Sequence, residues 1–179
     1  MIQRLTKKVK DLMEGISPPT RPEIMCGVSL AHHGLLVSLF RLSLHNVDLS
    51  PVPAHHLALL VSCVTSELRI ENVSGCGLVR MLSSVKCRDL HITRQNLGRE
   101  ETQALVQAME SGMEELRLNY EVTLDIEALT EYSGEGECRE VELWNDTATR
   151  YREQLRTWAR SKDWKVSQDY DCGFGVCTN

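Results

Sequence analysis

The clearest pattern of hydrophobic and polar positions lies between residues 87 and 109. Leu90 and Ile92 alternate with polar residues, which predicts a strand with one buried face. Asn96-Leu97-Gly98 interrupts this alternation, and apolar residues then continue at helical spacing as far as Met109. The stretch therefore predicts a strand, a turn and a short helix. A unit this small cannot bury its own apolar face, so it needs copies of itself stacked alongside.

The same pattern recurs along most of the chain. Two apolar residues separated by one polar residue mark each predicted strand, and the second of the two falls at positions 44, 70, 92, 118, 143 and 166. Helical patterns separate the strands, at residues 54–64, 78–85, 100–109, 126–132 and 149–160. Because parallel strands need long crossover connections, which each helical segment supplies, the series predicts a parallel sheet.

These units resemble leucine-rich repeats, in which a strand of the form LxxLxL is followed by a turn and a helix. The fullest match is Leu39-x-x-Leu42-x-Leu44, and degenerate versions follow at residues 67–73, 85–96, 113–122 and 138–145. The resemblance covers roughly residues 39–166. Asparagines after several strands are similar to the buried turn asparagine of that family, at Asn46, Asn72, Asn96 and Asn145. Helical connections make the chain similar to the ribonuclease-inhibitor-like and NOD-like receptor type, although its repeats are short and irregular. The resemblance implies an α/β leucine-rich-repeat solenoid with a parallel concave sheet, outer helices and an N-terminal helical cap.

Three segments are expected along the chain. Residues 1–22 predict an amphipathic basic helix and a proline-rich linker, and residues 23–168 predict the solenoid. Residues 23–40 are expected to form the helical cap, since prolines occupy the place where a preceding strand would fall. Residues 169–179 are expected to be a C-terminal tail, whose Cys172 and Cys177 would close a small ring if oxidised. The first helix packs on its own domain, is the end of a longer neighbouring domain, or contacts a partner or a membrane surface.

Charge and cysteine content limit the possible partners and the cellular compartment. The net charge is −5, of which residues 1–22 contribute +3 and the remainder −8. An acidic body argues against nucleic acid as a partner. The chain has no apolar run long enough to span a membrane. Seven cysteines without a secretory leader favour a reducing, cytoplasmic compartment.

The polar residues of the predicted strands align in three columns across one face of the sheet. The first column is Arg41, Glu67, Asp89, Glu115, Glu140 and Asp163; the middle column is Ser43, Arg69, His91, Arg117, Glu142 and Lys165; the third column is His45, Glu71, Thr93, Asn119, Trp144 and Ser167. Carboxylates in one file repel one another, and Arg69, Arg117 and Lys165 of the middle column would relieve that repulsion. The result is an acidic column beside an interrupted basic column. The alternative is that these charges pair with one another and only make the face favourable to water, with no binding role.

A charged dock for a basic segment of another protein is the predicted site, with Trp144 as an aromatic anchor. Its candidate residues are Glu67, Arg69, Glu71, Asp89, His91, Glu115, Arg117, Glu140, Glu142 and Trp144. The predicted function is thus a non-catalytic protein-interaction module, which the resemblance places in intracellular signalling of the innate immune type. An oligomerising or structural fragment of a larger NOD-like receptor is the alternative.

Catalysis and cofactors are not expected. Motifs of hydrolases, zinc proteases and phosphate-binding loops are absent from the sequence. Two histidine pairs, His32-His33 and His55-His56, stand at equivalent helix starts and offer a metal or pH-sensitive site as a further alternative. Adjacent histidines point in different directions, so neither a metal nor another cofactor is predicted.

Overall fold

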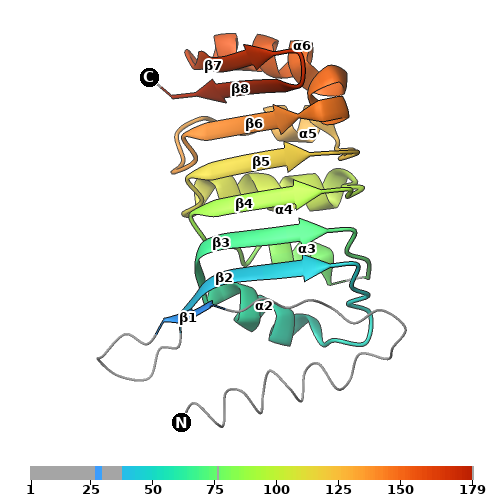
Figure 1. Ribbon diagram of the computed structural model, residues 1–179. Coiled ribbons are helices and arrows are strands. Elements are labelled where there is room, and N and C mark those ends of the chain that lie inside the picture. Colours follow the sequence, from blue (N-terminus) through green and yellow to red (C-terminus); the bar gives the residue numbers. More distant parts are fainter. Residues whose placement is uncertain (1–26, 30–37, 76, 179) are drawn as a thin grey trace.

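The computed structural model describes residues 27–29, 38–75 and 77–178. In these residues the chain forms an α/β fold, in which helices cover one face of a mixed, mostly parallel sheet (Figure 1). The strands are β1 (Gly27–Ser29), β2 (Ser38–His45), β3 (Val64–Glu71), β4 (Asp89–Thr93), β5 (Glu115–Asn119), β6 (Glu140–Trp144), β7 (Lys165–Tyr170) and β8 (Gly173–Cys177). Strands β2 to β6 are parallel and follow one another in chain order, which confirms the parallel part of the predicted sheet.

A helix follows each of the parallel strands. The helices are α2 (Ala54–Ser62), α3 (Leu78–Leu82), α4 (Arg99–Glu110), α5 (Ile126–Thr130) and α6 (Asn145–Ser161). All five lie close to the helical patterns of the sequence, but α6 begins directly after β6 and is longer than expected. Within the described residues, every helix is too short or too polar to cross a lipid bilayer.

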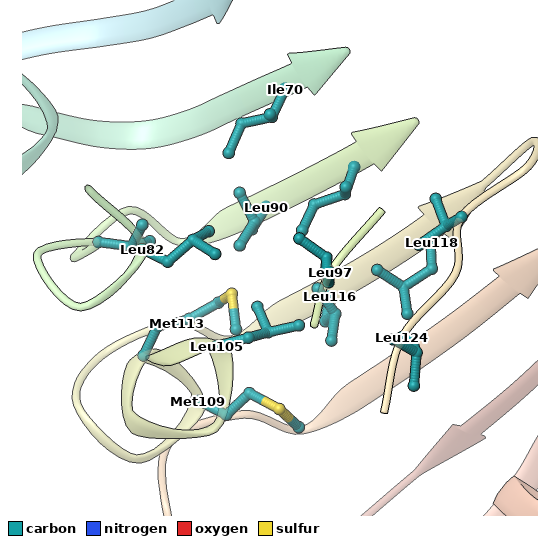
Figure 2. Packing of buried hydrophobic residues seen from close by; sticks show 14 of the residues in the cluster. Ile70, Leu82, Leu90, Leu97, Leu105, Met109, Met113, Leu116, Leu118 and Leu124 are labelled. Atoms are coloured by element: carbon teal, nitrogen blue, oxygen red, sulfur yellow. The ribbon is translucent and has the colours of Figure 1, made fainter. Parts of the chain in front are cut away.

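The core is a single layer between the sheet and the helices. Leu90 and Ile92 of β4 are fully buried, as are Leu105 and Met109 of α4. Figure 2 shows Leu90, Leu105 and Met113 close together in this layer, in front of the strands as drawn. Strands β4, β5 and β6 alternate buried and half-buried residues, as a sheet with one covered face requires. The aliphatic residues of the sequence pattern therefore serve packing.

The residue after each parallel strand has a left-handed backbone. Its φ is 49° at Asn46, 47° at Asn72, 48° at Arg94, 41° at Tyr120 and 56° at Asn145. Asparagine tolerates this conformation better than most residues, which accounts for the asparagines seen in the sequence. Two of them donate a side-chain hydrogen bond to an asparagine of the preceding unit, Asn72 to Asn46 in the turn after β2 (2.8 Å) and Asn145 to Asn119 at the end of β5 (2.6 Å).

Other side chains satisfy the buried backbone of the turns. Gln95 accepts a hydrogen bond from the Val73 amide and donates one to its carbonyl, both at 2.9 Å. The Thr147 hydroxyl accepts from the Val122 amide, and the Tyr151 hydroxyl bonds the backbone of Leu124. The turn asparagines at Asn46, Asn72 and Asn96 are exposed, and Asn145 is half-buried. They therefore do not occupy the buried position that the resemblance implied.

The expected helical cap at residues 23–40 is wrong where the structure describes it. Residues 27–29 form β1, which pairs antiparallel with β2, and residues 38–40 belong to β2 itself. The prolines lie at positions 18, 19 and 22, before this short edge strand, so they do not prevent it. The predicted helix at residues 1–16 and the linker behind it lie outside the described residues.

The predicted C-terminal tail is also wrong. Residues 173–177 form β8, which lies between β6 and β7 and pairs antiparallel with both. Phe174 and Val176 are fully buried against the helices, and this burial holds the strand in the sheet. Because Cys172 and Cys177 stand at opposite ends of an extended strand, their Cα atoms are roughly 16 Å apart. A disulfide needs about 6 Å, so the small ring cannot close in this fold.

Candidate functional site

Three columns of side chains cross the face of the sheet that the helices leave free, here called the open face. Strand register places Arg41, Glu67, Asp89, Glu115 and Glu140 side by side in the first column. The middle column holds Ser43, Arg69, His91, Arg117 and Glu142. The third column holds His45, Glu71, Thr93 and Asn119, with Trp144 at the end of β6. The predicted alignment is therefore confirmed from β2 to β5 in all three columns, and to β6 in the first two.

The expected sixth member of each column is wrong. Strand β7 pairs with β8 and not with β6, so Lys165 lies opposite Cys177. Asp163 precedes β7 with a left-handed backbone, and Ser167 stands at an irregularity in the ladder. Although residues 163–169 match the local pattern of the other strands, the antiparallel β8 separates them from the parallel series.

Glu67 is the most buried charged residue of the open face, with 6% of its surface exposed. Arg41 forms an ion pair with one of its oxygens, and the other lies 2.6 Å from Arg69 Nε and 3.7 Å from His91 Nδ1. Burial alone would raise the pKa of Glu67, but the hydrogen bond and charge of Arg69, aided by Arg41, lower it overall. Glu67 is therefore a buried anion that the surrounding cations hold in its charged form.

Arg117 connects three strands. Its Nε lies 2.8 Å from Glu142 Oε2 and also forms an ion pair with Glu115, while its Nη1 lies 3.1 Å from His91 Nε2. A guanidinium only donates, so His91 Nε2 accepts and the ring proton resides on Nδ1, toward Glu67. Burial, followed by the charge of Arg117, lowers the pKa of His91. His91 is thus a neutral link between two charged clusters.

A hollow of about 400 Å³ opens on this face, lined by His91, Thr93, Arg117, Asn119, Glu142 and Trp144. Four of these six residues were predicted as binding residues from the sequence. Trp144 donates its Nε1 proton to Glu142 at 3.1 Å and leans over Gly173, where an added Cβ would lie 3.0 Å from the ring. Glycine at position 173 therefore lets the indole tilt toward β8.

The carboxylates of Glu115, Glu140 and Glu142 lie within 4.8 Å of one another. Arg117 neutralises part of this cluster, but no described side chain pairs with the Glu140 carboxylate. Burial raises the pKa of Glu115, and the neighbouring carboxylates Glu142, Asp89 and Glu140 raise it further against the opposing charge of Arg117. Negative charge is therefore crowded at the β5–β6 end of the first column.

Over the three columns from β2 to β6, the acidic residues outnumber the basic ones. The carboxylates are Glu67, Glu71, Asp89, Glu115, Glu140 and Glu142, and the guanidinium groups are Arg41, Arg69 and Arg117. Six negative and three positive charges leave a net charge of −3 when the histidines are neutral. Glu71, another of the predicted residues, lies 2.6 Å from His45 Nδ1 and 3.1 Å from Arg94 Nη1.

The histidine pairs do not converge with other ligands in the described residues. His55 and His56 stand exposed at the start of α2 with ring centres 4.2 Å apart, and His32 and His33 lie outside the described residues. Among the described residues, the group with the spacing of metal ligands is Glu115, Glu140 and Glu142, two of which already pair with Arg117.

Several residues of the open face are absent from the predicted binding residues, although the third predicted column includes Thr93 and Asn119. Thr93 and Asn119 line the hollow as short side chains, and Gln168 of β7 reaches Glu142 Oε1 at 2.7 Å. Gly173 and Gly175 leave Cys177 as the side chain of β8 on this face. The alternation Gly173-Phe174-Gly175-Val176 was a usable signal, since the apolar residues at every second position predict a strand.

In comparisons of the chain with protein-family models, curated proteins and solved structures, no match was found.

Proposed function

We propose that the chain is a non-catalytic protein-interaction module, built as a leucine-rich-repeat-like solenoid, whose open face binds a basic segment of another protein. The net charge of −3 across the three aligned columns carries this proposal. A cationic segment would relieve the repulsion at Glu115, Glu140 and Glu142, which a single arginine only partly offsets. The hollow beside Trp144 offers an aromatic wall for one side chain of that segment.

The surrounding ion pairs support a rigid face. Glu67 and Arg117 hold side chains from β2 to β6 in one connected network, so little side-chain freedom remains to be lost on binding. Charges arranged in this way contribute more to partner selection and association rate than to affinity. Binding should consequently weaken steeply as salt concentration rises.

The test reverses the two carboxylates of the first column that are least engaged. Asp89 contacts Arg88 only at 4.0 Å, and Glu140 has no partner among the described side chains. Asp89→Lys with Glu140→Lys should reduce the affinity for an oligo-arginine peptide at least about tenfold, measured by calorimetry at low salt. Amide chemical shifts perturbed by the peptide should fall on β4, β5 and β6.

The matched control is Glu110→Lys with Glu127→Lys, which changes the net charge equally on exposed positions of α4 and α5. These substitutions should leave peptide affinity within about twofold of the unchanged chain. Equal loss in both double variants would mean that only overall charge matters, and the open face would not be the binding surface.

A further inference from the structure

Strand β7 is an edge of the sheet. It pairs with β8 on one side, and no other described strand lies on its second side (Figure 1). Half of the amides and carbonyls of an edge strand face away from its partner, where another strand can pair with them. The outward backbone groups of Lys165–Tyr170 therefore form a row that a further strand can use.

The side chains of β7 divide between the two faces. Register places Lys165 opposite Cys177, Gln168 opposite Gly175 and Tyr170 opposite Gly173, all on the open face. Val166 pairs with the buried Val176 on the helix side. Asp169 also lies there, since its Oδ2 stands 2.6 Å from Arg156 of α6.

Ser167 is the extra residue of the ladder. A Cβ on Gly175 would lie 2.7 Å from Ser167 Oγ and 2.8 Å from Gln168 Cγ, so both residues stand over the same glycine. With Ser167 set aside, Gln168 is the centre of the strand. Lys165 and Tyr170 then lie two ladder positions to either side of it on the same face.

The edge strand β7 also exposes apolar side chains beside its unpaired backbone groups. Val166 is 46% exposed and Tyr170 is 62% exposed, and both belong to the small set of large apolar side chains that stand in solvent among the described residues. One lies on each face of β7. A strand added to this edge would cover part of both.

We propose that β7 pairs antiparallel with β7 of a second copy of this chain, about a two-fold axis at Gln168. The strand is complementary to itself in this register: Lys165 lies opposite Tyr170 of the partner subunit, and Tyr170 lies opposite Lys165 of the partner subunit. Each pair sets an ammonium beside an aromatic ring on the open face. Val166 lies opposite Asp169 of the partner subunit on the helix side, and no like charges face each other.

The dimer is reversible and weak. A single edge strand buries little surface, and the irregularity at Ser167 interrupts the ladder near its centre. Since residues opposite each other in a ladder share a face, the two open faces of the dimer point the same way. The dimer thus forms one sheet across both copies and presents two open faces side by side. It does not depend on the function proposed above.

Analytical ultracentrifugation of the unaltered chain tests the pairing over roughly 10 µM to 1 mM. A reversible monomer–dimer equilibrium is expected. Tyr170→Lys places two lysines opposite each other at both ends of the paired strands and should weaken dimerisation about tenfold. Lys165→Glu combined with Tyr170→Lys places opposite charges there and should restore dimerisation to near the unaltered value.

Tyr120→Lys is the matched control, since Tyr120 is also half-exposed but lies in the turn after β5, and it should leave the dimer unchanged. Circular dichroism checks that every variant is folded. A chain that stays monomeric throughout the range, or a Tyr170→Lys variant that dimerises as tightly as the control, overturns the proposal. Failure of the double variant to regain association overturns the antiparallel register.

Discussion

His91 illustrates how one residue of the open face ties charge to packing. Its ring accepts from Arg117 through Nε2, at 3.1 Å, and directs Nδ1 toward Glu67. Protonating Nε2 would remove the acceptor and place a cation against the guanidinium. The structure therefore favours the neutral ring, and burial acts in the same direction by lowering the pKa of His91.

Acidification should consequently destabilise the fold. The unfolded chain binds a proton at His91 near the ordinary pKa of about 6.5, whereas the folded chain binds it only at lower pH. The contribution of His91 to stability is thus fully present above that value and is lost as the pH falls toward the lowered pKa of the folded state. Urea unfolding at pH 7.5 and at pH 5.5 should show lower stability at pH 5.5.

His91→Asn should reduce that difference between the two pH values. The lowered pKa of Glu67 makes the stability depend on pH only below the ordinary pKa of 4.5. Glu67 therefore does not contribute to the difference between pH 7.5 and pH 5.5. The raised pKa of Glu115 acts in the opposite sense, with stability lost as the pH rises from about 4.5. If the variant keeps the full pH dependence, another group is responsible.

In the turn after each parallel strand, sequence and structure agree only in part. Asn46, Asn72 and Asn145 suit the left-handed backbone there, whereas Arg94 and Tyr120 adopt the same conformation at a cost of about 1 kcal/mol each. The buried role that the leucine-rich-repeat resemblance gives to asparagine is taken by Gln95, which no pattern of asparagines could reveal.

Tyr120→Asn should therefore stabilise the chain by about 0.5–1 kcal/mol, because asparagine carries a smaller penalty at positive φ. Thermal or urea unfolding measures the gain. Tyr170→Asn is the control, since Tyr170 is likewise exposed but is not among the described residues with positive φ. A gain of equal size at both positions would trace the effect to loss of an exposed aromatic ring and not to backbone strain.

At the scale of the whole molecule, the parallel series and its columns could be predicted because each unit repeats a local pattern. Leu42, Leu68, Leu90 and Leu116 are equivalent in register, and their spacing is visible in the sequence. The end of the sheet could not be predicted in the same way. Residues 163–169 look like another repeat, and only the burial of Phe174 and Val176 places β8 between β6 and β7.

This end of the sheet yields a direct test. Phe174 is fully buried, and the guanidinium groups of Arg156 and Arg152 lie 5.2 and 5.9 Å from its ring centre. Phe174→Ala should lower the free energy of unfolding by about 3–5 kcal/mol, measured by urea denaturation.

Val166→Ala on the neighbouring strand serves as the comparison. Its side chain is 46% exposed, so the loss of stability should stay below about 1 kcal/mol. Phe174→Ala would instead behave like a surface change if residues 173–177 were a loose tail.

The position of β8 also bears on how the chain folds as it leaves the ribosome. Strands β2 to β6 can add one at a time in the order of their synthesis, each against its predecessor. Strand β7 emerges next, but the strand with which it pairs, β8, is synthesised after it and lies between β7 and β6. A nascent chain halted between Tyr170 and Gly173 would therefore expose the edge of β6 beside an unpaired β7. Unpaired strand edges aggregate readily, so chaperone binding would matter most at this stage.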